Sequence, residues 1–374
     1  MAKWLEKTLG EVTAFIAKGI PPKYTEEENE NTIRVLNQKC NRNFEISYNE
    51  SRIHDCEKKK VPVDKMLRAG DVLINSTGTG TAGRVAQMVE VTVPTTIDGH
   101  MILIRPSEEL DPIYYGYAVK SFQSQIEGLA EGSTGQTEIN RRRLQDEVII
   151  RYPRDKSVQK NIGSFLANID QKIKTNKKIN KNLADQSQAI YQQYFVAEAN
   201  PDWPLGHLSD LIDIKYGKDH KKLADGTYPV YGSGGIMRYV ERPLYEKESV
   251  LIPRKGTLNN VIYVNQPFWS VDTMFYTEMK QDNVAKFVYH YVKSKDLASM
   301  NAGSAVPSMT TAILNALELP LPSIEALKHF EISVAPMYEM MQKNEEESHK
   351  LAKLRDALLP KLMSGELDVS KIEL

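Results

Sequence analysis

The stretch from 158 to 195 constrains the fold of this chain most, because its apolar residues recur at helical spacing over a long distance. The stripe consists of Ile162, Leu166, Ile169, Ile173, Ile179, Leu183, Ile190 and Tyr194. Steps of three and four residues place such side chains on one face of an α-helix. A helix of about 38 residues is about 57 Å long. A narrow apolar stripe on so long a helix requires a second long helix to cover it.

A second stretch, from 327 to 363, carries a matching stripe. Moving the first stretch forward by about 168 positions superposes the two, and such self-similarity indicates a duplicated architecture. The superposed pairs are Ile162 and Phe330, Leu166 and Val334, Ile169 and Met337, Ile173 and Met341, Leu183 and Leu351, Ile190 and Leu358, and also Asn176 and Asn344. Pro336 is expected to kink or delay the second helix. The alternative is that the helices are unrelated and that each packs on its own domain.

The charges of the two stretches favour their pairing. The middle of the first carries Lys172, Lys174, Lys177, Lys178 and Lys181, and the matching place in the second carries Glu345, Glu346 and Glu347. These clusters meet if the helices run antiparallel about a two-fold axis through Asn176 and Asn344. Opposite charges select the partner and the register, although each exposed pair contributes little free energy. Two separately solvated faces are the alternative.

Length and composition indicate a protein of two globular domains with connecting segments, since the chain has 374 residues. Its formal net charge is -1, so no overall basic field indicates nucleic acid. The two cysteines, Cys40 and Cys56, belong to no metal-binding pattern, which fits a reducing cytosol and argues against a zinc site. The sequence shows neither a signal-peptide core nor an apolar run of membrane-spanning length, so we expect a cytoplasmic protein.

The segments that precede the two long stretches also repeat. GDVLINSTGTGTAGRVAQM, from Gly70, matches ESVLIPRKGTLNNVIYV, from Glu248, and each predicts a strand, a glycine-containing turn and another strand. A helix is predicted to follow in both copies, with Asp111 and Asp282 as N-caps.

The sequence therefore predicts an α+β chain with two similar mixed α/β domains, 1–153 and 199–322. They are separated by two long helices, 154–198 and 323–374 with its tail, that pair as an antiparallel coiled coil. The extra residues of the first domain, between about 25 and 60, are polar and are expected to form inserted loops.

Two short motifs raise the possibility of an enzyme. GTGTAG, from Gly78 to Gly83, has the spacing of a dinucleotide-binding loop, but a β-branched segment follows it where a helix is required. We interpret it as a turn between strands. DPIY, from Asp111, is similar to a motif of amino-methyltransferases, but no glycine motif for S-adenosylmethionine accompanies it, and we interpret it as a helix cap. A stand-alone enzyme that binds a nucleotide or S-adenosylmethionine remains an alternative function.

Polar loops occur at equivalent places in both copies, with side chains suited to nucleic acid. Arg, Asn and Gln can pair bidentately with base edges, whereas Ser and Thr suit phosphates. The candidate DNA-binding residues of the first copy are Ser76, Thr77, Thr79, Arg84, Gln136, Thr137, Asn140, Arg141 and Arg142. Those of the second copy are Tyr231, Ser233, Arg254, Lys255, Thr257, Asn259, Ser304 and Ser308. Ordinary polar turns are the alternative for any one of them.

Several segments resemble the specificity subunit of type I restriction-modification enzymes, and the resemblance covers the whole chain. These segments are LRDALLPKLMSGELDV from Leu354, YPVYGSGGI from Tyr228, VLIPRKGT from Val250 and GSAVPSMTTAILNALELPLP from Gly303. The first copy departs from the last pattern, with GSTGQTEINRRRL in its place. The start of the first long helix also departs, because it has Val158-Gln159 where the family often has glutamate-glutamine.

The resemblance implies a non-catalytic chain whose two target-recognition domains each read one half of a bipartite DNA site. It implies that the coiled coil spaces the domains and docks two methyltransferase subunits, which methylate adenine with S-adenosylmethionine. Restriction subunits would add ATP- and Mg-dependent cleavage, and this chain itself would bind no cofactor. From the helical stripe we expect Tyr191, Phe195, Leu359 and Leu362 to be uncovered and to dock the methyltransferases. A coiled-coil scaffold without a DNA role is a further alternative.

Overall fold

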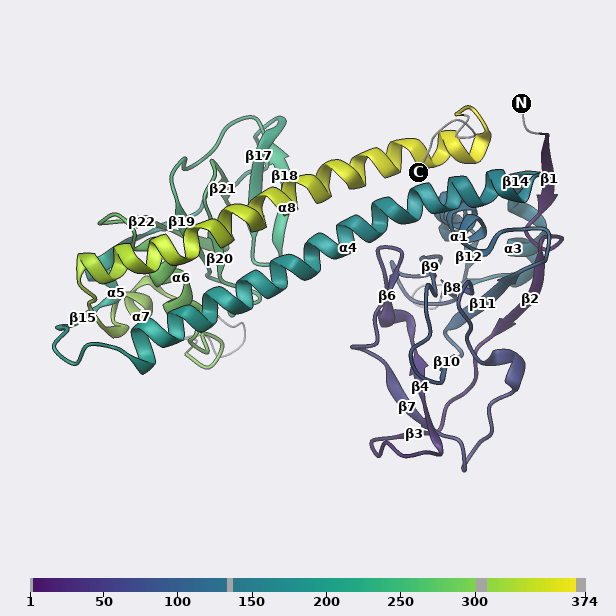
Figure 1. Cartoon of the computed structure of the whole chain (residues 1–374), viewed down its shortest axis with the longest axis horizontal. Coiled ribbons are helices and arrows are strands. Elements are labelled where there is room, and N and C mark those ends of the chain that lie inside the picture. The colour runs from purple at the N-terminus through teal and green to yellow at the C-terminus, as the bar shows by residue number, and fades with distance from the viewer. Residues whose placement is uncertain (1–2, 133–136, 301–307, 368–374) are drawn as a thin grey trace. The chain divides into compact units, whose positions relative to one another are not determined.

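The structure, a computed structural model, describes residues 3–132, 137–300 and 308–367. The chain divides into two compact units. Unit 1 comprises Met1–Asn176 with Glu346–Leu374, and unit 2 comprises Lys177–Glu345. Two long helices, α4 (Lys156–Gln192) and α8 (Ile324–Ser364), each contribute residues to both units (Figure 1).

Unit 1 is built on a four-stranded antiparallel sheet. Its strands are β2 (Thr13–Lys18), β11 (Met101–Pro106), β8 (Val72–Asn75) and β9 (Val85–Gln87), in the order β2-β11-β8-β9. Helix α1 (Pro112–Ser121) packs into the same core as β8 and β11. The Asp111 side chain accepts hydrogen bonds from the backbone N–H groups of Ile113 and Tyr114, both at 3.0 Å, which confirms the predicted N-cap. Strands β1 (Trp4–Thr8) and β14 (Ile149–Pro153) form a separate antiparallel pair.

The insertion of unit 1 is not a set of loops, so that prediction was wrong. It forms much of a second sheet of β10 (Thr95–Ile97), β4 (Thr32–Leu36), β7 (Arg52–Asp55) and β3 (Tyr24–Thr25), in that order. A short hairpin, β5 (Asn41–Arg42) and β6 (Glu45–Ile46), belongs to the same segment. The polar composition is misleading because a few residues, such as Leu36 and Cys40, are buried and join a core with Leu73 and Ile97.

Unit 2 repeats the plan of unit 1, as the sequence predicted. Its main sheet has β16 (Ile212–Tyr216), β22 (Met274–Met279), β19 (Ser249–Pro253) and β20 (Ile262–Val264), in the order β16-β22-β19-β20. Helix α6 (Ala285–Lys293) corresponds to α1, and the pair β15 (Leu205–His207) and β23 (Glu318–Pro320) corresponds to β1 and β14. A short helix α5 (Leu208–Leu211) and a sheet of β17 (Asp225–Gly232), β18 (Gly235–Val240) and β21 (Trp269–Ser270) complete the unit.

One predicted cap of unit 2 was wrong. Helix α6 begins at Ala285, and its N-cap is Val284 rather than Asp282. Asn283 adopts a left-handed conformation with φ 60°, so the chain turns between Asp282 and the helix. The two domain helices therefore begin differently although their C-terminal ends share the sequence Val-Lys-Ser.

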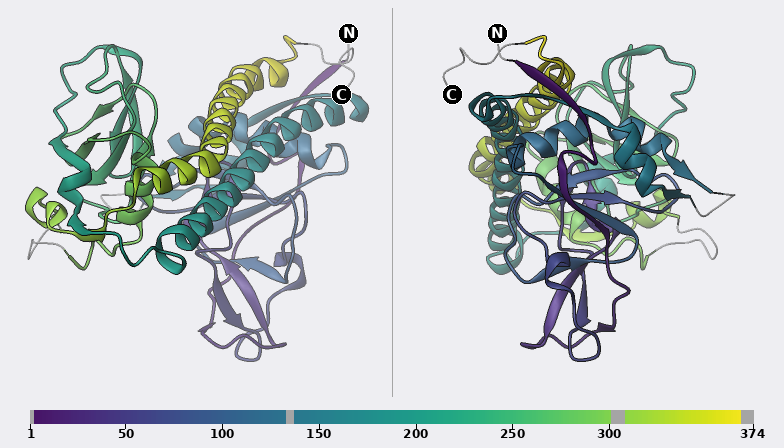
Figure 2. Two further views of the ribbon diagram at one scale, coloured as in Figure 1. Left: turned by 60° about the vertical axis from the view of Figure 1, so that its left-hand side comes forward. Right: turned by 90° about the vertical axis from the view of Figure 1, so that its right-hand side faces the viewer.

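The two long helices run antiparallel within unit 1 (Figure 2). Asp170 of α4 pairs with Arg355 of α8 at 2.5 Å, whereas Lys172 pairs with Glu347 at 3.2 Å. As the residue number increases along α4, the number of the residue that it contacts on α8 decreases. The pairing of Lys172 with Glu347 confirms the predicted meeting of the opposite charges.

The helices are also antiparallel within unit 2. The Asn180 side chain donates to the carbonyl oxygen of Met341 at 2.9 Å and accepts from Asn344 at 2.8 Å, while the ring of Tyr191 contacts that of Phe330 at 6.2 Å between centroids. The predicted place of Ile179 in the seam was wrong, since 40% of it is exposed. Polar Asn176 and Asn180 lie at this part of the seam instead.

Helix α8 passes through Pro336 without interruption and begins well before it, at Ile324. The proline therefore does not delay the helix. Helix α4 ends at Gln192 in a π-helical turn, Gln193–Ala197, close to the predicted end.

Candidate nucleic-acid interface

In unit 1 the glycine-containing turn after β8 lies against a short strand, β13 (Glu138–Ile139). Thr77 and Glu138 form an antiparallel bridge, and the backbone N–H of Ile139 donates to the carbonyl of Ser76 at 2.8 Å. The turn leads into β9 rather than into a helix, so it is the strand turn that the sequence predicted. The structure thus brings the loops around 77–84 and 137–141, which are far apart in sequence, to one place.

Unit 2 builds the same junction from different residues. Lys255, after β19, forms an antiparallel bridge with Ser308, and the N–H of Met309 donates to the carbonyl of Arg254 at 2.9 Å. A capped helix follows the junction in both units. Asn140 caps α3 (Arg141–Glu147) and Thr310 caps α7 (Thr311–Asn315) through their side chains. The backbone frame of the candidate surface is therefore duplicated, while its side chains differ.

The predicted DNA-binding residues in the turn of unit 1 differ in how far they are exposed. Ser76 is fully buried, because the junction with Ile139 covers it, so the prediction that its side chain binds DNA was wrong. Arg84 donates to the carbonyl of Gly80 at 3.0 Å and holds the turn. Thr79 is exposed, and Thr77 shares its hydroxyl with His100 at 2.9 Å. Gln136 lies outside the described residues, and Thr137 is half-buried beside β13.

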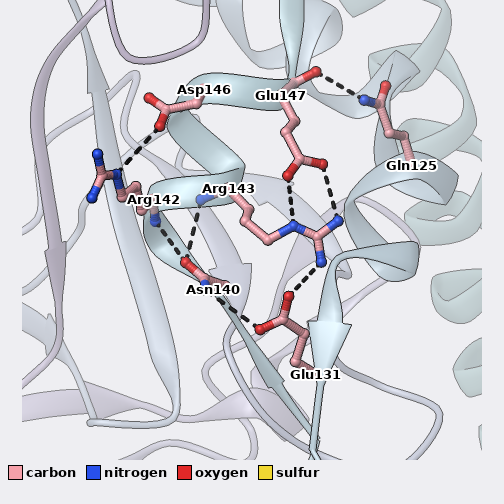
Figure 3. A network of polar contacts seen from close by, with 7 residues as sticks. All are labelled: Gln125, Glu131, Asn140, Arg142, Arg143, Asp146 and Glu147. Carbon is pink, nitrogen blue, oxygen red and sulfur yellow. Dashed lines mark hydrogen bonds and ion pairs between the residues drawn. The ribbon is translucent and has the colours of Figure 1, made fainter.

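The three arginines at the start of α3 differ in their contacts, and Figure 3 shows those of Arg142 and Arg143. Arg143 binds Glu131 of β12 (Ala130–Glu131) at 2.5 Å and Glu147 at 2.6 Å. These hydrogen bonds lower the pKa of both carboxyl groups and keep them charged. Arg142 pairs loosely with Asp146, at 3.6 Å. Arg141 is exposed as well, and within the described part of the chain it has no ion pair.

In unit 2 the exposed side chains at the junction include Lys255 and Thr257. Arg254 lies over the ring of Tyr216 at 5.4 Å and donates to the carbonyl of Asp272 at 3.1 Å, so its guanidinium is held in place. Such a cation on an exposed aromatic ring suits a sugar-phosphate backbone or a base face.

Other predicted residues of unit 2 support the surface rather than form it. Asn259 donates to Asp296 at 3.0 Å and accepts from the N–H of Ala298 at 2.9 Å, so its side-chain amide already has partners. Asn260 fixes Ser233 by donating to its carbonyl at 2.7 Å.

Tyr231 packs in an apolar core and its hydroxyl accepts from Gln266, so little of this side chain is exposed for the predicted contact with DNA. Ser308 forms the bridge itself, and Ser304 lies outside the described residues.

Lys18 and Tyr216 at the two junctions were not predicted from the sequence. Lys18 pairs with Glu138 of the bridge in unit 1, and Tyr216 lies under Arg254 in unit 2. They occupy equivalent positions at the ends of β2 and β16, directly before Gly19 and Gly217. Both glycines donate a backbone hydrogen bond to the strand beside them, and a Cβ on either would lie within about 2 Å of a backbone oxygen. A glycine after the first strand of each copy, next to a cationic or aromatic residue, was the available signal.

The four residues predicted to dock partners do not form an uncovered patch, so that prediction was wrong. The ring of Phe195 packs between those of Phe287, at 4.7 Å, and Phe330, at 5.0 Å. Tyr191 joins the same core, and both rings line a cavity of about 200 Å³. Leu359 and Leu362 belong to the core of unit 1. They are covered because the helices pack against the domains as well as against each other.

The apolar side chains of α8 that are exposed lie elsewhere along the helix. Ile332 is 63% exposed and Met340 is 49% exposed, and the exposed Pro336 lies between them at helical spacing. Ile324, at the start of the helix, is also exposed.

Among the residues that the structure describes, no group of three or more His, Cys, Asp or Glu side chains is placed to hold a metal ion. No helix in this described part is long and apolar enough to span a membrane.

Comparisons with known proteins agree with the duplicated plan. The family model for the type I restriction modification DNA specificity domain matches residues 1–184 and again residues 200–347. A putative type I specificity subunit of Mycoplasma genitalium is 24% identical over 285 residues, which are 70% of this chain and 73% of the relative. The MjaIX specificity subunit of a type I restriction enzyme from Methanocaldococcus jannaschii is 23% identical over 304 residues, which are 70% of this chain and 69% of the relative.

The fold is also that of a solved member. The crystal structure of the type I restriction-modification S subunit from M. genitalium has a TM-score of 0.63, with 20% identity and 96% of both chains covered. The family match extends over most of the chain, once in each half. This chain therefore belongs to the type I restriction-modification specificity subunits, the components that recognise DNA in these systems.

Proposed function

We propose that each unit reads one half of a bipartite DNA target through the junction described above. The observation that carries this proposal is the duplicated frame, in which Thr77 bridges Glu138 in one unit and Lys255 bridges Ser308 in the other. A matching backbone frame with different exposed side chains suits two domains that bind DNA in the same way but recognise different base sequences. The stand-alone enzyme and the scaffold without DNA are not favoured by this arrangement or by the family.

The exposed charges at the two junctions supply phosphate contacts in this proposal. The net charge of the chain is -1, so affinity for DNA has to come from local cations rather than from an overall field. Arg254 and Lys255 provide these cations in unit 2, and Arg141 provides one in unit 1. Thr79 and Thr257, which are exposed beside them, are suited to hydrogen bonds with bases or phosphates.

The chain acts in this proposal as a non-catalytic member of a cytoplasmic complex, in keeping with its family. Two methyltransferase subunits dock on the long helices and modify adenine with S-adenosylmethionine. Restriction subunits add ATP- and Mg-dependent cleavage. The exposed apolar side chains of α8, rather than Tyr191 and Phe195, are the residues suited to this docking.

Exchange of one domain tests the proposal. Residues 3–152 are replaced by the equivalent domain of a relative, the chain is expressed with its methyltransferase, and the methylated motif is determined. One half-site should change while the other half-site and the gap stay the same. A change in both half-sites would contradict independent reading by the two units.

A further inference from the structure

In both units one residue of the domain helix is hydrogen-bonded into a group that joins both long helices, directly in unit 2 and through Asp170 in unit 1. The C-terminal ends of α1 and α6 share the sequence Val-Lys-Ser, at 119–121 and 292–294, with Ser294 as the C-cap of α6. Two residues before this sequence stand Tyr117 in unit 1 and His290 in unit 2, both buried. We call the hydrogen-bonded groups around these two residues the braces.

The brace of unit 1 is charged. The Tyr117 hydroxyl donates to Asp170 of α4 at 2.6 Å, and the same carboxylate receives Arg355 of α8 at 2.5 Å. Burial and the negative charge of Asp170 raise the pKa of Tyr117, so its hydroxyl remains a donor at every relevant pH. The carboxylate thus joins the domain helix to both long helices.

The brace of unit 2 is neutral. His290 Nδ1 lies 2.8 Å from Gln188 Oε1 of α4, and Nε2 lies 2.9 Å from the Tyr338 hydroxyl of α8. Burial lowers the pKa of His290 to about 3, so the ring is uncharged at neutral pH. A neutral imidazole has one donor and one acceptor nitrogen, which matches the glutamine oxygen and the tyrosine O–H.

The braces occupy matching places although their chemistry differs. The shift of about 168 positions that superposes the long helices places Asp170 on Tyr338. The same shift places Gln188 on Asp356, which is the neighbour of Arg355 in the sequence. Tyr117 and His290 match on the domain side. The ion pair of unit 1 thus corresponds to a neutral network in unit 2, with two attachment points at matching positions and the third offset by one residue. This correspondence indicates a demand on position rather than on charge.

A second contact beside each brace also lies at a matching position and differs in chemistry between the units. In unit 2 the buried Lys286 binds Glu331 of α8 at 2.6 Å and Glu248 at 2.9 Å. In unit 1 the place of Glu331 on the long helix is taken by Gly163, where a Cβ would lie 2.8 Å from the backbone nitrogen of Tyr114. Unit 1 thus brings α4 directly against α1, whereas unit 2 spans the same junction with side chains.

We propose that the braces are positioning devices that fix the orientation of each recognition domain on its part of the helix pair, and so make the complex selective for one gap between the half-sites. This inference rests on the proposed function. Apolar packing holds two surfaces together without direction, whereas hydrogen bonds between buried groups hold only near one geometry. Both long helices run through both units, so a domain that rocks on its helices changes the spacing at which its junction meets DNA.

The test uses the complete methyltransferase complex and two variants, Tyr117→Phe and Tyr338→Phe, each of which removes one hydroxyl from a brace. Methylation is measured on duplexes with the correct half-sites and with the native gap, or a gap one base pair longer or shorter. Methylation at the native gap should fall by about fivefold, the effect of one buried hydrogen bond. Methylation at the altered gaps, relative to the native one, should rise, and the half-site sequences should not change.

Matched controls separate orientation from stability. Tyr115→Phe on α1 and Tyr291→Phe on α6 also remove a buried hydroxyl, but those hydroxyls bond to Thr13 and to the carbonyl of Glu318 within the domains. The controls should lower methylation equally at all gaps, if at all. Gap selectivity as sharp in both brace variants as in the controls would overturn the inference. A wild-type complex that methylates without a fixed gap would overturn the proposed function instead.

Discussion

At the scale of single residues, the two junction cations of unit 2 make the clearest prediction. Replacing Arg254 and Lys255 together by alanine should weaken DNA binding by the complex. The slope of log affinity against log salt concentration should become shallower by about two, because two phosphate contacts no longer release counterions. Titration of DNA at several salt concentrations gives this slope.

The control for this variant changes the same charge at another place. Arg242 and Lys247 are exposed and precede β19, whereas Arg254 and Lys255 follow it. The double alanine variant of Arg242 and Lys247 should keep the wild-type slope. An unchanged slope for the variant of Arg254 and Lys255 would place this junction away from DNA.

A second residue-scale prediction concerns pH. Burial lowers the pKa of His290 from its ordinary 6.5 to about 3. Below pH 6.5 this histidine is therefore protonated in the unfolded chain but stays neutral in the folded chain. Stability is therefore lost as the pH falls from 6.5 towards 3, at up to about 1.4 kcal/mol per pH unit. His290→Gln should show a shallower loss in unfolding experiments between pH 7 and 5. His329→Gln, at an exposed position of α8, is the control and should follow the wild-type curve.

Which polar side chains are free could not be predicted from the sequence. Ser76 lies in a loop of suitable composition and Tyr231 near the end of β17. Both are buried, because exposure depends on contacts with residues far along the chain. Asn259 was predicted to bind DNA because its side-chain amide can pair with a base edge. In the structure that amide donates to Asp296 and accepts from the N–H of Ala298. The place of the junction in each unit could be predicted from the sequence repeat. The contacts that each polar side chain makes there could not.

At the scale of elements, periodic signals succeeded and compositional ones failed. The long helices were found nearly to their ends, since an apolar stripe is a local property of a helix. The strands between Tyr24 and Asp55 were missed because short strands bury few residues each. Ile179 was misplaced because the stripe is polar around Asn176 and Asn180, where hydrogen bonds replace apolar contacts.

The exposed face of α8 makes an element-scale prediction. Changing Ile332 and Met340 to glutamate should reduce copurification of the methyltransferase by at least about tenfold, because two charges cannot be buried in an apolar interface without partners. The fold should be preserved, since both side chains are largely exposed. Val89→Glu, at an exposed position of unit 1, is the control. Copurification equal to that of the control would show that the partner does not dock on this face.

At the scale of the whole molecule, the long helices should set the gap between the half-sites. The units meet along the chain at Asn176–Lys177 in α4 and at Glu345–Glu346 in α8. Inserting four residues at both places adds about 6 Å to each helix and nearly preserves the stripe. The gap should grow by about two base pairs, at about 3.4 Å per base pair, with unchanged half-sites.

Inserting two residues at both places is the matched control. It turns each stripe by about 200° and should abolish activity rather than change the gap. The methylated motif of each variant is the measurement. Full activity of the four-residue variant at the original gap would mean that the helices do not set the spacing.

Sequencing of methylated adenines, in the genome of cells that express this chain with its partner subunits, tests the central claim most directly. The duplicated junctions predict a single motif of two different half-sites, separated by a gap of fixed length and unspecified sequence. Exchange of the unit 1 domain should then alter one of those half-sites. Methylation at a continuous motif, or at two half-sites with no fixed gap, would contradict the account.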